Sequence, residues 1–343
     1  MFRVYSGTTA DEVWLKIASA FSECGTARSR SSRGGPTRDL GHVAITILDP
    51  RQRWVVSRKP ALNPAFAIAE VVWILNGRDD AEFLNFFNRQ LPNYAGKGVK
   101  YDGAYGWRLR KHRGIDQLDR AYRALRNCQT SRQVVLQIWD ACADLPTEDG
   151  APASPDVPCN IVSLLKVRDG ALEWTQILRS NDVFRGLPHN FVQFTTLQEV
   201  MAGWLGVELG SFHLVTDSLH LYKTDAKVVN DTTRRVCSHN TDWLSLRKEE
   251  SEAAFLTLAR AVDCIVDPCR SPQQVLDLDA TKGLSKPFRN LLMILIAEGL
   301  RRRRRCACAD RIVESCSNPL LRQLWENWQA RLSRPLETIA GDK

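Results

Sequence analysis

The stretch between residues 161 and 216 constrains the fold more than any other part of the chain. Residues 161–167 and 172–178 are two runs of apolar and β-branched side chains, joined by a turn that contains Asp169-Gly170. Asp-Gly between two such runs is a strong signal for a β-hairpin. A helical pattern follows over residues 190–205, and residues 211–216 predict another strand. Strands and a long helix in one segment predict a domain of the α/β (α+β) class.

The preceding residues also carry mixed patterns. Residues 42–48 and 54–57 flank a turn at Asp49-Pro50 and predict a second hairpin. Residues 134–139 predict a strand. The helical patterns cover residues 10–22, 65–75 and 115–125. The segments rich in Gly, Ser, Arg, Pro or Ala, which predict irregular loops, cover residues 26–36 and 140–158.

The C-terminal part has a different character, because helical periods occur there without strand signals. The helical patterns cover residues 253–265, 272–278, 288–300 and 319–332. We therefore expect a catalytic domain over residues 1–243 and a helical C-terminal extension over residues 244–343.

Composition narrows the class of protein. The 343 residues include ten cysteines that lack the paired spacings of a disulfide scaffold, and no secretory leader precedes them. No apolar run approaches the ~20 residues that a membrane helix needs. We expect a soluble, cytoplasmic protein that has no membrane partner.

The net charge of +8 raises the question of nucleic-acid binding. No helix-turn-helix, zinc-finger or RNA-binding motif accompanies that charge, so nucleic acid is not the expected partner. The arginines at 301–305 are typical of a solvated face, with contact to RNA or DNA as the alternative. Cys306, Cys308 and Cys316 lack the second tight pair of a zinc site, so no metal is expected.

Cys159 is the first candidate for chemistry. It follows Pro158 at the junction of a loop and a strand, where rigid backbone can present a thiol to a ligand. A lone cysteine in such a place is more often a buried structural thiol. The blocks downstream favour chemistry: they are Arg179-Ser180-Asn181-Asp182, Gly186-Leu187-Pro188-His189-Asn190 and His220-Leu221-Tyr222.

These blocks resemble the thymidylate synthase family, whose pattern is a Pro-Cys nucleophile, an Arg-Ser-x-Asp-x-x-x-Gly-Leu-Pro-x-Asn block and a later His-x-Tyr. The matches upstream are Arg33-Gly34, Glu70 with Trp73, Tyr105-Gly106 with Arg110, and Ser131-Arg132. All of them occur in the family's order over residues 33–222, which chance does not explain. The resemblance implies a twisted mixed sheet with flanking helices, a homodimer, and methylenetetrahydrofolate as co-substrate.

The resemblance also implies a chemical role for the central residues. Carbon 5 of a pyrimidine becomes nucleophilic when a thiolate adds to carbon 6, which is the role of Cys159. Arg179 would favour the thiolate and bind the phosphate of the nucleotide. Arg33, Ser180 and, from a partner subunit, Arg132 would bind the same phosphate through charge-assisted bonds. Any one of these arginines could instead form a surface salt bridge, but the set in register favours the phosphate.

Base and sugar recognition follow the same pattern. Asn190 can match the O4 and N3–H edge of uracil, whereas Asp would suit cytosine. Asn190 could also cap the helix that follows it. His220 and Tyr222 share one face of a strand and would hold the sugar hydroxyls, with ordinary packing as the alternative.

Glu70 lies in a strongly apolar helix, where a carboxylate is costly unless it has a partner or a function. We assign Glu70 to acid/base work through water near O4, with Tyr105 assisting removal of the carbon 5 proton. Asp182 and Gly186 match the positions at which the family meets its folate.

The chain departs from the family pattern in ways that bear on the product. Asn160 and Gln133 replace a usual His and a usual second Arg, and the folate-packing Trp before Tyr105 has no clear counterpart. We predict one-carbon transfer to carbon 5 of a pyrimidine nucleoside monophosphate, with dUMP to dTMP as the first choice. The alternatives are a hydroxymethylase acting on dUMP, dCMP, CMP or UMP, and a non-catalytic nucleotide-binding sensor or partner protein.

Overall fold

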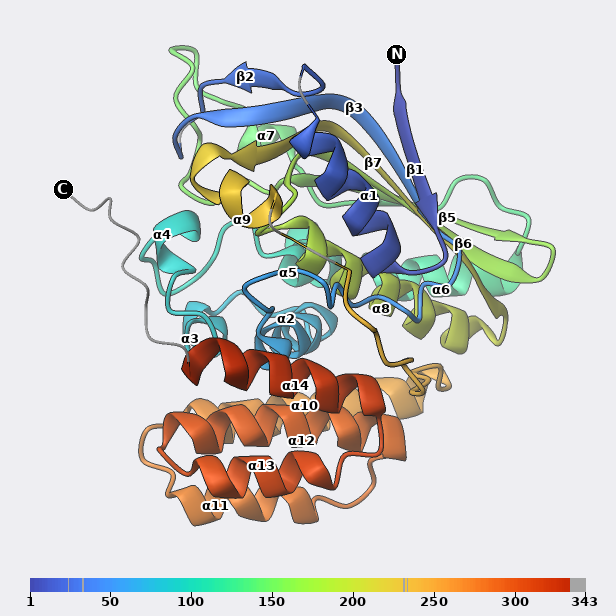
Figure 1. The fold of residues 1–343 in the computed structure, drawn as a ribbon. Coiled ribbons are helices and arrows are strands. Elements are labelled where there is room, and N and C mark those ends of the chain that lie inside the picture. The colour runs from blue at the N-terminus through green and yellow to red at the C-terminus, as the bar shows by residue number, and fades with distance from the viewer. Residues whose placement is uncertain (24, 33, 231, 233, 334–343) are drawn as a thin grey trace.

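The computed structural model describes residues 1–23, 25–32, 34–230, 232 and 234–333. At its centre is a seven-stranded sheet with the order β1-β3-β7-β6-β5-β4, in which β2 also pairs with β3 (Figure 1). The strands are β1 (Arg3–Gly7), β2 (Arg28–Arg30), β3 (Thr37–Ile47), β4 (Val135–Gln137), β5 (Asn160–Arg168), β6 (Ala171–Asp182) and β7 (Glu208–Tyr222). The β1–β3 and β6–β7 pairs are parallel and the other pairs are antiparallel. The predicted mixed sheet is confirmed.

The hairpin of β5 and β6 forms where the sequence predicts it. Asp169 and Gly170 connect the strands with φ angles of 50° and 77°. Two successive positive φ angles are what a two-residue hairpin turn requires, and Asp-Gly adopts them at low cost. The hairpin holds Cys159, just before β5, beside the end of β6, where the Arg179 N–H donates to the Cys159 carbonyl at 3.0 Å.

Two helices cover one face of the sheet: α1 (Ala10–Ser22) contacts β1 and β3, and α8 (Leu187–Leu205) contacts β6 and β7 (Figure 1). The α8 helix begins three residues before the predicted start at Asn190, because Pro188 lies in its first turn, where a missing N–H costs nothing. Gly206 follows the last residue of α8 and has a φ of 66°.

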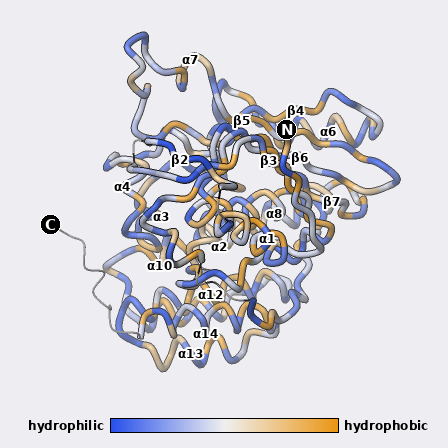
Figure 2. Tube along the Cα trace, turned by 45° about the horizontal axis from the view of Figure 1, so that its top comes forward, coloured by the Kyte–Doolittle hydropathy of each residue, from blue (hydrophilic) through white to orange (hydrophobic). Residues whose placement is uncertain are grey.

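The α2 helix (Pro64–Leu75) lies between the sheet layer and the C-terminal helices, and it contacts α8, α10, α12 and α14. Asn63 caps it by accepting from the Phe66 N–H at 3.2 Å. Every residue of α2 except Glu70 is buried, as expected of a helix that is apolar on all sides. In Figure 2 apolar segments run through both the sheet layer and the C-terminal helices, which share one hydrophobic core.

Five helices form the C-terminal part of the fold, and three of them, α10, α12 and α14, pack against α2. The five helices are α10 (Lys248–Val266), α11 (Pro272–Leu276), α12 (Lys286–Arg302), α13 (Cys306–Glu314) and α14 (Pro319–Ser333). A buried polar cluster ties them to the segment before α10: Asp242 accepts from the Asn290 amide at 3.0 Å and from the Asn318 amide at 2.7 Å. The sequence pattern does not predict α13.

The arginine run at 301–305 serves the fold. Arg301 and Arg302 pair at 2.7 Å with Glu298, whose side chain is fully buried. Arg303 donates to the carbonyls of Arg270, Gly299 and Asp267. The first three arginines of the run therefore bind groups of the protein itself, which weakens the alternative that the run contacts nucleic acid.

Three local predictions are wrong. Residues 54–57 form no strand with residues 42–48; they are buried, and Ser57 binds the Asp11 carboxylate through its N–H at 2.7 Å and its hydroxyl at 2.8 Å. Arg28–Arg30 forms the strand β2 and not an irregular loop, because it pairs with residues 37–39 at the start of β3. The loop at 140–158 contains α7 (Ala141–Asp144), capped by Asp140. The remaining short helices are α3 (Ala81–Asn85), α4 (Pro92–Ala95), α5 (Tyr105–Arg110), α6 (Gln117–Asn127) and α9 (Ala226–Asn230).

Candidate active site

A cavity of about 1740 Å³ opens where β6 ends and α8 begins. Its wall also includes side chains from α2, α5, β7 and the loop before Cys159. Ordinary ligand cavities measure about 300–1,000 Å³, so this cavity has room for more than one nucleotide-sized ligand. The predicted site residues in its wall are Glu70, Tyr105, Cys159, Arg179, Ser180, Asp182, Gly186, Asn190, His220 and Tyr222.

Arg179 fixes the backbone next to Cys159. Its Nε donates to the Pro158 carbonyl at 3.0 Å and its guanidinium donates to the Val157 carbonyl at 2.9 Å. Cys159 is half-buried and is not in a disulfide. The guanidinium therefore lies against the backbone that precedes Cys159, and a positive charge near a thiol favours the thiolate form that acts as a nucleophile.

Tyr105 lies near Cys159 at the start of α5. Burial raises the pKa of the Tyr105 hydroxyl well above its ordinary value, and the charge of Cys159 acts in the same direction. An interaction with the Asn160 amide opposes these effects without cancelling them. Tyr105 therefore stays protonated at neutral pH and can serve as a hydrogen-bond donor in the cavity.

Asp182 holds the turn between β6 and α8. One carboxylate oxygen accepts from the N–H groups of Phe184 and Arg185, both at 2.7 Å. The other oxygen, Oδ2, is buried without a hydrogen-bond partner in the described structure. Burial raises the pKa of Asp182, and the two backbone bonds only partly offset that effect. This second oxygen is the one that remains for a ligand.

Asn190 lies in the first turn of α8, buried at the cavity wall. Its Nδ2 donates to the Asn181 Oδ1 at 3.1 Å. That bond orients the Asn190 amide, because it leaves one N–H and the carbonyl oxygen for a ligand. One donor beside one acceptor matches the O4 and N3–H edge of uracil. Asn181 is a site residue that the sequence analysis did not single out.

His220 and Tyr222 lie at the end of β7, as the period-two spacing predicts. The Ser180 hydroxyl and the His220 Nδ1 are 3.2 Å apart, and burial lowers the pKa of His220. The Tyr222 ring packs edge-on to His220 at a centroid distance of 5.5 Å. Polar groups from two neighbouring strands therefore meet in the wall of the cavity that Cys159 also lines.

Glu70 has a partner that the sequence analysis missed. The His189 Nδ1 lies 3.0 Å from the Glu70 Oε2, which is an ion-pair distance. Neither of these two buried atoms makes a hydrogen bond in the described structure. The His189 ring also packs edge-on against Phe66 at 5.0 Å. His189 occupies a variable position of the family pattern, so the pattern gave no signal for it. The apolar surroundings of Glu70 indicated a partner without indicating which one.

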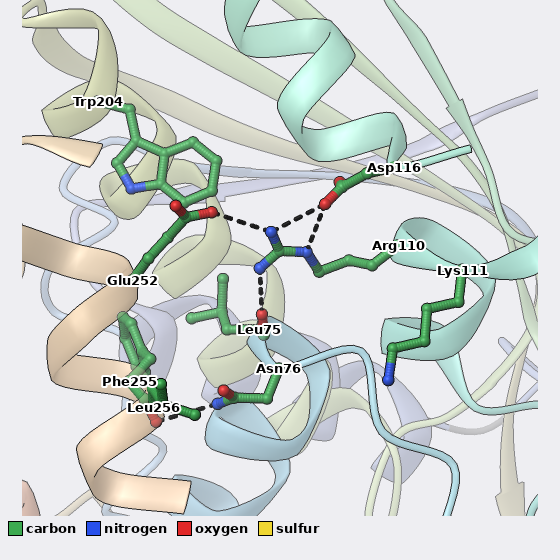
Figure 3. A pocket seen from close by; sticks show the side chains of 9 residues that line it. All are labelled: Leu75, Asn76, Arg110, Lys111, Asp116, Trp204, Glu252, Phe255 and Leu256. Atoms are coloured by element: carbon green, nitrogen blue, oxygen red, sulfur yellow. Dashed lines mark hydrogen bonds and ion pairs between the residues drawn. The ribbon is translucent and has the colours of Figure 1, made fainter. Parts of the chain in front are cut away.

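Two residues of the predicted pattern, Arg132 and Arg110, lie outside this arrangement. Arg33 is not among the residues that the structure describes. Arg132 is not in the wall of the cavity of its own chain, and its carbonyl accepts from Lys166. Arg110 lines a separate cavity of about 350 Å³ between α2, α5, α8 and α10. There it pairs with Asp116 at 2.9 Å and with Glu252 at 3.0 Å, so its role is to join α5 to α10 (Figure 3).

Comparison with known proteins decides the family. The family model described as thymidylate synthase matches residues 47–263. The chain belongs to the thymidylate synthase family. A putative thymidylate synthase of Methanothermobacter thermautotrophicus is 32% identical over 226 residues, which are 64% of this chain and 94% of that relative. The resemblance stated from the sequence and the predicted α/β fold are confirmed.

Two phage proteins are also similar to this member of the family. A deoxyuridylate hydroxymethyltransferase of Bacillus phage SP01 is 33% identical over 240 residues, 66% of this chain and 61% of the relative. Another of that name from Pseudomonas phage M6 is 35% identical over 197 residues, 57% of this chain and 55% of the relative. The chain thus spans less than two thirds of the length of either phage relative.

The thymidylate synthase family implies a folate, and the cavity can be tested for it. Besides the Asp182 Oδ2, the Gln193 Oε1 and the Asn181 Nδ2 are buried in the cavity wall without a hydrogen-bond partner in the described structure. The Trp139 Nε1, the Glu70 Oε2 and the His189 Nδ1 in the same wall also lack a hydrogen-bond partner there. Such a mixture of donors and acceptors suits a pterin ring, whose edge carries N–H groups and a carbonyl. Buried polar atoms normally have partners, so these atoms fit a polar ligand such as methylenetetrahydrofolate.

The described residues contain neither a membrane-spanning helix nor a cluster of metal ligands. None of the helices described is both long and apolar enough to cross a bilayer. No group of three or more His, Cys, Asp or Glu side chains in the described part of the chain could hold a metal ion. In particular, the Cys316 thiol is buried and faces the Asn318 carbonyl.

Proposed function

We propose that this chain transfers a one-carbon unit from methylenetetrahydrofolate to carbon 5 of a pyrimidine nucleoside monophosphate, with dUMP as the first substrate. The observation that carries this proposal is the convergence of Cys159, Arg179, Asn190 and Glu70 on one cavity. A thiol beside a guanidinium, an amide with one free donor and one free acceptor, and a carboxylate among apolar side chains are the groups that this reaction requires.

In the proposed mechanism Cys159 adds to carbon 6 of the base, and the electron pair of the double bond moves to carbon 5 and O4. Asn190 holds the N3–H and O4 edge, and the protonated Tyr105 stabilises charge near the base. Glu70 moves protons near O4 through water, and Tyr105 assists removal of the carbon 5 proton. Methylenetetrahydrofolate supplies the one-carbon unit and, for a methyl product, also the hydride.

The phosphate and the folate have separate parts of the cavity. Arg179, Ser180, His220 and Tyr222 bind the phosphate and the sugar in this proposal, with Arg33 adding a charge. Asp182 and Gly186 meet the folate: a Cβ at residue 186 would lie 3.1 Å from the Asn181 Oδ1, so glycine keeps this turn open.

We further propose a homodimer in which Arg132 reaches the phosphate of the partner subunit. Buried and half-buried residues alternate along β6 and β7, as in a sheet with one face packed and the other available. Arg132 lies outside the cavity of its own chain, so only a neighbouring chain could receive it there.

We also propose a boundary between the catalytic domain and the helical extension at residue 243, and a cytoplasmic location. The family model extends to residue 263, so the helical extension of residues 244–343 includes part of the matched region. A nucleophilic Cys159 must stay reduced, which favours the cytoplasm.

Two products are considered, dTMP and a 5-hydroxymethylated nucleotide. The sequence favoured dTMP as the first choice, whereas the names of the two phage relatives and Asn160 in place of the family's His favour a hydroxymethylated nucleotide. Mass spectrometry of dUMP, dCMP, UMP and CMP, each incubated with methylenetetrahydrofolate, separates these outcomes. Methylated dUMP with dihydrofolate indicates a synthase, and a hydroxymethyl adduct with tetrahydrofolate indicates a hydroxymethylase.

The competing class is a protein that binds a nucleotide without transforming it. Cys159→Ser should abolish turnover and keep nucleotide binding if the chain is an enzyme. Cys128→Ser is the matched control, because Cys128 is exposed and lies outside the cavity. Nucleotide binding without any product from the wild-type protein would favour the sensor.

A further inference from the structure

Glu70 and His189 form a pair of titratable side chains in the cavity wall. His189 lies in the first turn of α8, directly before Asn190, and Glu70 lies on α2. The two side chains meet in the wall of the cavity that contains Cys159, with the His189 Nδ1 3.0 Å from the Glu70 Oε2. Phe66 packs against the ring and restricts its rotation.

This arrangement determines which nitrogen of His189 can act as a base. A carboxylate beside Nδ1 favours the tautomer that carries its proton on Nδ1, and this leaves the lone pair of Nε2 available. In a catalytic triad a carboxylate likewise holds the imidazole of the histidine in the correct tautomer. His189 is partly exposed to the cavity, so a water molecule can reach it.

The position of the pair relative to the base follows from Asn190. His189 and Asn190 both line the cavity at the start of α8, so a base held by Asn190 through its O4 and N3–H edge would bring O4 and carbon 5 to the part of the wall that contains His189. Glu70 faces the same region in the proposed mechanism. A water molecule bound between His189 and the nucleotide would then lie next to the transferred one-carbon unit.

We propose that His189, oriented by Glu70, deprotonates a water molecule that adds to the one-carbon unit, so that the product is the 5-hydroxymethyl nucleotide. This inference rests on the proposed function and specifies its product. The water oxygen bonds to the methylene carbon attached to carbon 5, and its proton passes to His189 Nε2. The displaced electron pair moves onto O4, then restores the double bond between carbons 5 and 6 as the Cys159 sulfur leaves carbon 6. No hydride is used, so tetrahydrofolate is released unoxidised.

The first test is the fate of labelled reactants with the wild-type protein. Incubation of [5-³H]dUMP with methylenetetrahydrofolate in H₂¹⁸O should release tritium and give 5-hydroxymethyl-dUMP that carries ¹⁸O. Tritium release with dTMP as the product would overturn the inference and leave the proposed function intact. Failure of the protein to alter any of the four nucleotides would remove both.

The second test replaces the base and keeps the ring. His189→Phe preserves an aromatic contact with Phe66 and cannot accept a proton. Loss of a general base costs about 10²- to 10⁴-fold, so we expect at least a 100-fold fall in hydroxymethyl formation. Tritium release, which precedes the water step, should change less than about threefold. A thiol such as 2-mercaptoethanol should then capture the one-carbon unit as a thioether.

A matched pair of variants controls for folding and for the loss of any histidine. His189→Asn keeps a polar group near Glu70, and it should lose hydroxymethyl formation as His189→Phe does. His42→Asn makes the same change at the rim of the same cavity, where His42 pairs with Asp217 at 2.9 Å. Its φ of 54° is one that Asn tolerates. This control should keep hydroxymethyl formation within about twofold of the wild-type rate.

A measurement without folate tests the pair directly. NMR of the ligand-free protein labelled with ¹⁵N-histidine should show the N–H signal of a His189 tautomer protonated at Nδ1, because the Glu70 carboxylate lies 3.0 Å from that nitrogen. That signal should be lost in His189→Phe and in Glu70→Gln and retained in His42→Asn. Hydroxymethyl formation by His189→Phe within threefold of the wild-type rate, or an N–H signal unaffected by Glu70→Gln, would overturn the proposal.

Discussion

Replacing Asn190 by Asp tests how the protein recognises its base. In the structure the Asn190 Nδ2 donates to the Asn181 Oδ1 at 3.1 Å, and its second N–H is free to donate to O4 of uracil. An aspartate would place a carboxylate oxygen opposite O4, so a donor is replaced by a charged acceptor. The N–H groups of a cytosine amino group would find an acceptor there instead.

The magnitude follows from one lost hydrogen bond. A hydrogen bond that involves a charged group contributes about 1.5–3 kcal/mol, and each 1.4 kcal/mol corresponds to about tenfold. We therefore expect kcat/KM for dUMP to fall about 10- to 150-fold in Asn190→Asp, while kcat/KM for dCMP rises. The Asn181 amide must also rotate to donate from Nδ2, which is feasible because that nitrogen has no other partner in the described structure.

The assay is tritium release from 5-tritiated dUMP and dCMP, measured with the same folate concentration. Asn88→Asp is the matched control: it adds the same charge to the wall of the same cavity, and an aspartate can still accept from the Gln90 N–H as Asn88 does at 3.1 Å. An unchanged ratio of kcat/KM for the two nucleotides in Asn190→Asp would refute this account of base recognition.

Three further predictions concern stability and assembly. Glu298→Ala leaves two arginines without their buried partner, and breaking a buried pair costs about 3–5 kcal/mol, so urea unfolding should show a loss of that order; a loss below about 1 kcal/mol would contradict the pairing. Asp140→Asn should destabilise the protein at neutral pH, because hydrogen bonds from Arg113 and then His112 lower the pKa of Asp140 in the folded state. The stability that this carboxylate contributes is present above its unfolded pKa and is lost as pH falls through the folded pKa. The difference in the free energy of unfolding between wild type and variant should therefore shrink in acid, and a difference independent of pH would refute the role of Asp140. Mixing inactive Arg132→Ala and Cys159→Ser subunits should restore turnover through hybrid dimers with one intact site, and a mixture that stays inactive although hybrids form would exclude a shared site.

The fold was predictable where local residues decide the structure. Asp169-Gly170 can adopt two positive φ angles, so the hairpin beside Cys159 forms where the pattern places it. The second hairpin failed because the partners of β3 are remote: β3 pairs with β1 and with β7, which begins at Glu208. No local pattern around residues 42–57 records those partners.

In the candidate site, too, the residues in local sequence patterns were predictable and the contacts between remote residues were not. The blocks around Cys159, Arg179 and Asn190 are recognisable because each has a fixed spacing along the chain. The contact between Glu70 and His189 joins two helices that are more than a hundred residues apart in sequence, and His189 occupies a position that the family pattern leaves open. Only the packing of α2 against α8 brings these two side chains together.

The most direct test of the central claim, that Cys159 adds to carbon 6 of the base, uses 5-fluoro-dUMP with methylenetetrahydrofolate. Fluorine at carbon 5 cannot leave as a proton does, so the reaction should stop with the nucleotide and the folate bound to the protein. Mass spectrometry of the digested protein should then locate the adduct on the peptide that contains Cys159. No adduct under saturating nucleotide and folate, or an adduct on another cysteine, would contradict the account.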